Sequence, residues 1–173
     1  MATALLIIDV QQGMFMLSRP LYQGQQVVER IASLLERARS ENVSVFHVRH
    51  NGGPGHILER ETAGWRLHPL VSPQKHEPVV DKQHSSCFQD TTLHQQLQAS
   101  QIDKVVIAGM QTEYCVDSAC RAAAALGYRS VLVSDAHTTF DTSVLSAVQI
   151  IAHHNLTLGD GFAELALNNE VRL

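Results

Sequence analysis

Apolar residues follow two alternating patterns along the chain. Short apolar runs, which are typical of strands buried on both faces, lie at 4–9, 43–48, 77–82, 104–109, 130–135 and 156–160. Segments of helical periodicity or composition lie at 25–40, 91–100, 116–127, 142–155 and 161–169. In the first of these helices, one face carries Val27, Val28, Ile31, Leu34, Leu35 and Ala38. The alternation predicts a doubly wound α/β fold, in which helices cover both faces of a parallel sheet.

Composition and charge fit one globular domain that spans residues 1–173. The chain is 45% hydrophobic and 17% charged, and its net charge of −4 includes no run of Lys or Arg, which argues against a nucleic-acid partner. No apolar stretch is long enough to cross a bilayer. Because the first residues also lack the pattern of a signal peptide, we expect a cytoplasmic protein without a membrane partner.

Cysteine content and loop motifs narrow the chemistry further. The three cysteines include no C-x-x-C pair, so neither a disulfide framework nor a zinc site is indicated. No glycine-rich phosphate-binding motif follows a predicted strand. We therefore expect no cofactor and a small-molecule substrate. The one long irregular segment, 49–76, is rich in Gly and Pro, which is typical of a functional loop or lid.

Candidate catalytic residues stand where the predicted strands end. Ligands bind beyond the carboxyl ends of the strands in such sheets, and there the sequence places Asp9, Lys82 and, after strand 104–109, Cys115. A helix that begins just after Cys115 would favour its thiolate near neutral pH. Asp9 can take the thiol proton and Lys82 can keep Asp9 ionised. Backbone N–H groups of 109–115 can stabilise an oxyanion.

Each of these residues also has a purely structural interpretation. A cysteine near a helix start is often a small buried hydrophobic residue, and we favour that interpretation for Cys87 and Cys120. An aspartate that ends a strand often caps a turn, as we expect for Asp135. For Asp9 and Lys82, the catalytic interpretation depends on each residue having the other as a partner.

Four segments carry a resemblance to a known family. They are "LLIIDVQQGMF", "VVDKQHSSCFQDTTLHQQL", "VVIAGMQTEYCV" and "VLVSDAHTTFD", and in this order they resemble the isochorismatase-like cysteine hydrolases, which include nicotinamidases and N-carbamoylsarcosine amidase. The likeness extends over 4–165. It implies a three-layer α/β/α fold whose six-stranded parallel sheet has the order 3-2-1-4-5-6. It also implies a catalytic triad of Asp9, Lys82 and Cys115.

The resemblance further implies the geometry of the turn before the nucleophile. A cis peptide bond would join Met110 to Gln111, and the N–H groups of Gln111 and Cys115 would form the oxyanion hole. Isochorismate-cleaving members lack the nucleophilic cysteine, so Cys115 favours cleavage of a small amide, ureido or carbamoyl C–N bond through a thioester. The family also makes a homo-oligomer, a dimer or tetramer, the expected assembly.

Histidines leave a metal-dependent alternative open. Metal-binding members of the family use an Asp-x-His-x5-His pattern and a further His. His50 and His56 keep this spacing and His68 follows, but Val48 stands at the Asp position. We therefore expect no metal, and a nicotinamidase-type or isochorismatase-type hydrolase is the alternative.

Aromatic residues near the motifs are candidates for the pocket wall. They are Phe15, Trp65, Phe88 and Tyr114, and each has core packing or loop anchoring as an alternative role. A non-catalytic binding protein on the same fold is a further alternative. The complete Asp, Lys and Cys set weighs against it.

Overall fold

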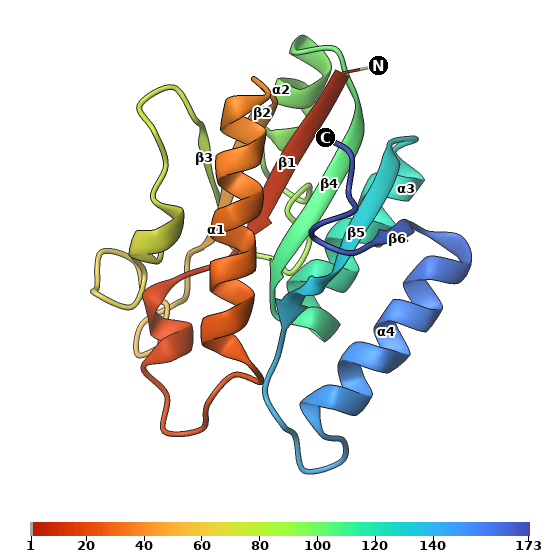
Figure 1. Cartoon of the computed structure of the whole chain (residues 1–173). Helices are drawn as coiled ribbons and strands as arrows, with labels where there is room; N and C mark the ends of the chain where they lie inside the picture. Colours follow the sequence, from red (N-terminus) through yellow and green to blue (C-terminus); the bar gives the residue numbers. More distant parts are fainter. Residues whose placement is uncertain (1) are drawn as a thin grey trace.

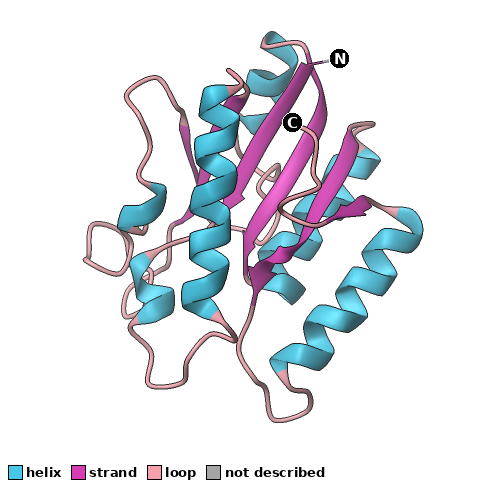
Figure 2. Ribbon diagram, viewed as in Figure 1, coloured by secondary structure: helices cyan, strands magenta, loops and turns pink. Residues whose placement is uncertain are grey.

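The computed structural model describes residues 2–173 and has three layers (Figures 1 and 2). Its central sheet has the order β3-β2-β1-β4-β5-β6, and every neighbouring pair is parallel. This confirms the predicted fold class and strand order. The strands are β1 (Ala2–Ile8), β2 (Ser44–His50), β3 (Val79–Lys82), β4 (Ile102–Met110), β5 (Arg129–Thr138) and β6 (Glu164–Ala166).

Helices cover both faces of the sheet. The α-helices are α1 (Gly24–Ser40), α2 (Leu93–Ala99), α3 (Asp117–Ala125) and α4 (Ala147–Gly161). Three short helical turns are η1 (Gln12–Phe15), η2 (Pro69–Val71) and η3 (Thr112–Val116). Helix α1 packs on one face, and α2, α3 and α4 contribute to the core on the other. None of these helices has the length and apolar composition needed to cross a membrane.

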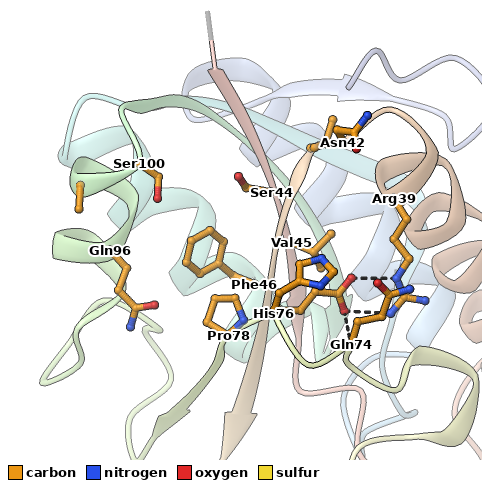
Figure 3. A pocket seen from close by; sticks show the side chains of 13 residues that line it. Arg39, Asn42, Ser44, Val45, Phe46, Gln74, His76, Pro78, Gln96 and Ser100 are labelled. Atoms are coloured by element: carbon orange, nitrogen blue, oxygen red, sulfur yellow. Dashed lines mark hydrogen bonds and ion pairs between the residues drawn. The ribbon is translucent and has the colours of Figure 1, made fainter.

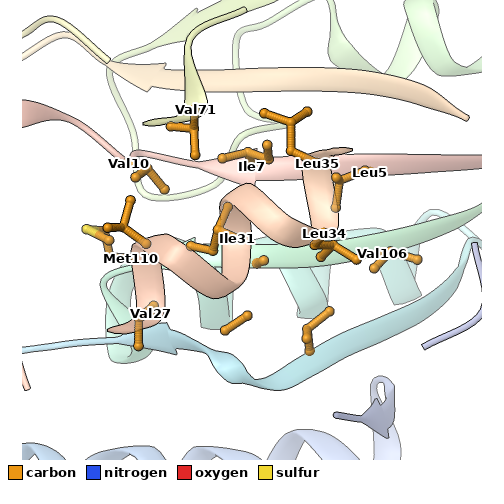
Figure 4. Packing of buried hydrophobic residues seen from close by; sticks show 14 of the residues in the cluster. Leu5, Ile7, Val10, Val27, Ile31, Leu34, Leu35, Val71, Val106 and Met110 are labelled. Carbon is orange, nitrogen blue, oxygen red and sulfur yellow. The ribbon is translucent and has the colours of Figure 1, made fainter. Parts of the chain in front are cut away.

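The apolar patterns of β1 and α1 explain how the first face is built. Leu5 and Ile7 of β1 point toward α1, whereas Ala4, Leu6 and Ile8 belong to the core on the opposite face. A strand buried on both faces needs no polar alternation. The predicted apolar face of α1 is buried throughout and packs on β1 and β4 (Figure 4).

The C-terminal elements differ from the prediction. The segment 156–160 continues helix α4 instead of forming a strand, because Leu158 extends the buried face of that helix. The last strand is β6, and the predicted helix 161–169 is absent, since only Gly161 is helical and it is the last residue of α4. Helix α4 also begins later than residue 142. Ser146 accepts a hydrogen bond from the N–H of Gln149, whose side chain bonds back to Ser146, and such a capping box marks the first turn of a helix.

Candidate active site

Three strand ends bring Asp9, Lys82 and Cys115 together. Asp9 follows β1, Lys82 is the last residue of β3, and Cys115 lies in η3 after β4. Nζ of Lys82 lies 2.8 Å from Oδ2 of Asp9. The same Nζ lies 3.2 Å from Sγ of Cys115. The ammonium group therefore contacts both the carboxylate and the sulfur.

Burial and charge set the protonation state of Lys82. The residue is 2% exposed, and Asp9 is fully buried. Burial lowers the pKa of the Lys82 ammonium, but the nearby Asp9 carboxylate and Cys115 sulfur raise it more, so this pKa lies above its usual value. Nζ also donates a hydrogen bond to the carbonyl of His84, at 2.9 Å. The site thus holds a lysine that stays charged although it is buried.

The Cys115 sulfur is a thiol in the resting site. Burial and the negative charge of Asp9 raise its pKa to about 12, and Lys82 offsets only part of this. The raised pKa is opposite in direction to the thiolate-favouring effect expected of the following helix. Since the thiolate is the nucleophilic form, attack by this sulfur requires transfer of its proton to a base.

The turn that carries Cys115 differs from the predicted helix start. The peptide bond between Met110 and Gln111 is cis, and the π-helical turn η3 then runs directly into α3. Cys115 therefore lies inside a helical segment that begins at Thr112. The carbonyl of Gln111 accepts hydrogen bonds from the N–H groups of Tyr114 and Val116, both at 3.2 Å. These two bonds fix the backbone on either side of Cys115.

A buried chain of hydrogen bonds holds η3 against β5 and α4. Oγ1 of Thr112 lies 2.9 Å from Nδ1 of His137. Nε2 of His137 lies 2.9 Å from Oδ1 of Asn155, and Nδ2 of Asn155 donates to the carbonyl of Ser134 at 3.2 Å. Burial lowers the pKa of His137 to about 4, so the neutral ring accepts from Thr112 and donates to Asn155. No sequence motif indicated this chain.

Gln11 connects the end of β1 to β2 and to the loop 49–76. Its side-chain amide donates to the carbonyls of His50, at 3.0 Å, and Trp65, at 2.9 Å. Its Oε1 accepts from the N–H of His50 at 2.9 Å. No sequence motif indicates this role of Gln11, although a buried polar residue beside a catalytic candidate suggests a bridging role.

Close packing of β4 on β1 fixes the backbone beneath Asp9. At Gly109, φ is +137°, and a Cβ atom would lie 2.1 Å from the carbonyl oxygen of Ile8. Asp9 itself has φ +50°, a left-handed conformation that aspartate adopts more readily than most residues. The chain therefore turns sharply where it presents the carboxylate.

A cavity of about 320 Å³ opens beside these groups. Asp9 and Cys115 line it together with His50, Gln111, Glu113 and Tyr114. The loop 49–76 contributes His56 and Leu58, and the chain after β5 contributes Phe140 and Thr142. The cavity is large enough for a small molecule, and the candidate nucleophile lies on its wall.

Of the four aromatic pocket candidates, only Tyr114 is among the described residues that line this cavity. The other three each pack against a side chain that does not line the cavity. Phe15 lies against His68 at 4.8 Å, Trp65 under the Arg49 guanidinium at 3.5 Å, and Phe88 against Tyr128 at 6.0 Å, measured between ring centroids or to the centroid. The indole N–H of Trp65 also donates to Asn51 at 2.6 Å, so Trp65 anchors the loop.

The three candidate metal ligands are not grouped around one point. His50 and His56 line the cavity, with ring centroids 5.8 Å apart. His68 instead packs on Phe15 and accepts the N–H of Leu70. Within residues 2–173, no three His, Cys, Asp or Glu side chains are arranged to hold a metal ion. Burial, followed by the charge of Lys82, lowers the pKa of His50, so its ring is neutral at pH 7.

A larger hollow of about 810 Å³ lies near the start of β2, between the ends of α1 and α2 (Figure 3). Its wall contains Glu77, whose carboxylate binds Arg39 through two hydrogen bonds, at 2.8 and 2.9 Å. Nε2 of His47 lies 3.0 Å from the same carboxylate. None of Asp9, Lys82 and Cys115 lines this hollow, so the smaller cavity is the candidate active site.

Comparison with known proteins identifies the family. The model of the isochorismatase domain matches residues 3–152. The chain belongs to the isochorismatase family. This membership confirms the resemblance carried by the four sequence segments. The solved structure of an isochorismatase from Pseudomonas putida KT2440 superimposes on this chain with a TM-score of 0.93 at 29% identity. The match covers 96% of this chain and 88% of that one, so the two chains share a fold.

Two relatives of this chain are named as hydrolases. Streptothricin hydrolase of Streptomyces noursei is 35% identical over 170 residues, which are 98% of this chain and 61% of that protein. The chain thus spans less than two thirds of that relative. Maleamate amidohydrolase of Pseudomonas putida is 32% identical over 149 residues, which are 76% of this chain and 70% of that protein.

Proposed function

We propose that this isochorismatase-family chain is a cysteine hydrolase that cleaves a small amide, ureido or carbamoyl C–N bond through a thioester. The observation that carries the proposal is the position of Lys82, whose Nζ contacts both Asp9 and Cys115. The names of the two relatives support hydrolysis as the reaction class, and one of them is an amidohydrolase.

In the first half of the reaction, Asp9 takes the proton of the Cys115 thiol as the sulfur attacks the substrate carbonyl carbon. The high pKa of this thiol makes the base necessary. The N–H groups of Gln111 and Cys115 stabilise the oxyanion. When the tetrahedral intermediate collapses, the C–N bond breaks and Asp9 gives the proton to the leaving nitrogen. The products of this half are an amine or ammonia and a thioester on Cys115.

In the second half, water hydrolyses the thioester. Asp9, again ionised, takes one proton from the water as the oxygen attacks the carbonyl carbon. The C–S bond then breaks, and the proton returns to the sulfur. Lys82 stays protonated throughout, because its pKa is raised, and it stabilises the negative charge that alternates between Asp9 and the sulfur. After the acid product dissociates, the site is again in its starting state.

The test is a screen for release of ammonia or amine from small amides, ureas and carbamoyl compounds, with isochorismate as a comparison. On a cleaved substrate, Cys115→Ala should abolish turnover, whereas Cys120→Ala, which changes a buried thiol away from the cavity, should retain it. Asp9→Asn should lower kcat by about 10²–10⁴-fold, because it removes the base.

The thioester can be trapped directly. Hydroxylamine added during turnover should yield the hydroxamate of the substrate acid, and intact-protein mass spectrometry should show an acyl adduct on Cys115. Turnover that persists in Cys115→Ala would contradict the proposal. Activity that is lost on chelation and returns with zinc, manganese or iron would instead support the metal-dependent alternative.

A further inference from the structure

Two charged side chains on the cavity wall have no ion-pair partner within residues 2–173. They are Glu113 and Arg19, and both line the cavity that contains Cys115. Arg19 is exposed to solvent, and its guanidinium lies 4.8 Å from the centroid of the Phe140 ring. Glu113 differs from Arg19 in solvent exposure, because part of its carboxylate is buried.

The two oxygens of the Glu113 carboxylate are not equivalent. Oε1 accepts a hydrogen bond from Oγ1 of Thr139 at 2.9 Å. Oε2 is buried and has no hydrogen-bond donor among the described residues. An ionised carboxylate has about four acceptor positions, and a buried oxygen without a donor is costly. Glu113, a residue of the cavity wall, therefore has an acceptor oxygen that lacks a hydrogen-bond donor among the described residues.

A ligand in the cavity can supply the missing hydrogen-bond donor. Glu113 lines the cavity, and the terminal torsion of a glutamate side chain is broad, so rotation about this torsion can present a carboxylate oxygen to a bound ligand. A cationic donor suits this oxygen better than a neutral one, because hydrogen bonds between charged groups are roughly twice as strong as neutral ones. Arg19 offers less selectivity, since a solvated charge contributes little to binding.

We propose that Glu113 is a specificity-determining residue that selects substrates with a cationic nitrogen, an ammonium or guanidinium group, near the scissile amide. This inference rests on the proposed hydrolase function for the meaning of "substrate". It concerns binding, however, and can be tested without turnover. A ligand of this class would pair its positive charge with Glu113 while its amide carbonyl lies at Cys115.

Three amides that differ only in the group at the end remote from the amide test the proposal: β-alaninamide, which is cationic, butyramide, which is neutral and of the same size, and succinamate, which is anionic. Their dissociation constants are measured by ligand-observed NMR titration of Cys115→Ala protein, which cannot form the thioester. We expect β-alaninamide to bind on the order of 10- to 100-fold more tightly than butyramide, and succinamate to bind most weakly.

Variants in the same Cys115→Ala background assign the effect to one residue. Glu113→Gln should abolish the preference for β-alaninamide over butyramide. Glu113→Asp keeps the charge and should retain part of the preference. Arg19→Gln is the matched control on the same cavity, and it should leave the preference between these two ligands unchanged.

Two results would overturn the inference. The first is equal binding of β-alaninamide and butyramide, or no binding of β-alaninamide. The second is a preference for β-alaninamide over butyramide that persists in Glu113→Gln. Failure of the proposed function gives a different result. In that case the charge preference would be present in the binding data, but wild-type protein would cleave none of the amides, ureas and carbamoyl compounds in the hydrolysis screen.

Discussion

Removal of Lys82 should destabilise the fold because it leaves a buried charge alone. Nζ of Lys82 and Oδ2 of Asp9 are 2.8 Å apart, and both side chains are 0% exposed. At an effective dielectric constant of about 20, two unit charges at this distance attract by about 6 kcal/mol. Desolvation of both ions offsets much of this energy in the intact pair, but in Lys82→Met the desolvation of Asp9 has no compensation.

We expect Lys82→Met to lower the free energy of unfolding by about 3–5 kcal/mol, the range for breaking a buried ion pair by removing one partner. Asp9→Asn/Lys82→Met removes both charges, and asparagine tolerates the left-handed backbone at this position. The double variant should therefore recover roughly half or more of the loss seen in Lys82→Met.

Urea unfolding at pH 7, followed by circular dichroism for the wild type, both single variants and the double variant, measures these free energies. The m-values should agree among the four proteins, which shows that the same transition is compared. A loss below about 1 kcal/mol in Lys82→Met, the size of an exposed pair, would refute the reasoning. So would a double variant that is as unstable as Lys82→Met.

Three further predictions concern Glu77, Gly109 and the thiols. Burial raises the folded-state pKa of Glu77, but Arg39 and neighbouring donors outweigh it and lower this pKa from 4.5 to about 2. The carboxylate therefore contributes roughly 3 kcal/mol of stability above pH 4.5, which is lost as the pH falls toward 2. In urea unfolding, Glu77→Gln should be less stable than the wild type at pH 7 by an amount that shrinks across this window, and a difference that does not depend on pH would exclude the linkage. Gly109→Ala should lower the unfolding free energy by about 2 kcal/mol or more, since a Cβ there meets the backbone of β1 at 2.1 Å with φ +137°; a melting temperature equal to that of the wild type would contradict the packing. Iodoacetamide should label Cys115 before Cys87 and Cys120, which are both 0% exposed. The rate of Cys115 labelling should rise steadily with pH above 7 because the pKa of this thiol is about 12. Peptide mass spectrometry that finds either other thiol labelled first would contradict this order.

Helices and strands were predictable from the sequence where the spacing of apolar residues repeats several times. Helix α1 shows one apolar face from Val27 to Ala38, and the buried strands lack polar alternation, so both follow from local sequence. The positions of Asp9 and Lys82 follow from a general property of parallel sheets, whose strand ends lie at one edge. The segment 156–160 is too short for either period to dominate, and only the buried contact of Leu158 in α4 decides its structure.

Side-chain contacts between distant segments were not predictable. The hydrogen bonds of Gln11 connect residues 39 and 54 positions apart, and those of His137 connect residues 25 and 18 positions apart. No local pattern encodes such pairs. Of the aromatic candidates, Tyr114 lines the cavity and the other three do not. For Trp65, the long irregular loop gives no period from which the direction of the side chain can be derived.

The way the loop 49–76 is attached to the sheet separates two kinds of evolutionary change. Its returning end is joined to the chain after β1 by backbone hydrogen bonds from Gln12 to Arg66, at 2.8 Å, and from Gly13 to Gly64, at 2.9 Å. Between its two attached ends, Gly53 and Gly55 have no neighbour within 4 Å of an added Cβ. Residues inserted or exchanged at this tip can reshape the wall formed by His56 and Leu58 without moving Asp9. Descendants of one ancestral gene can thus acquire new substrates while they inherit the same reaction.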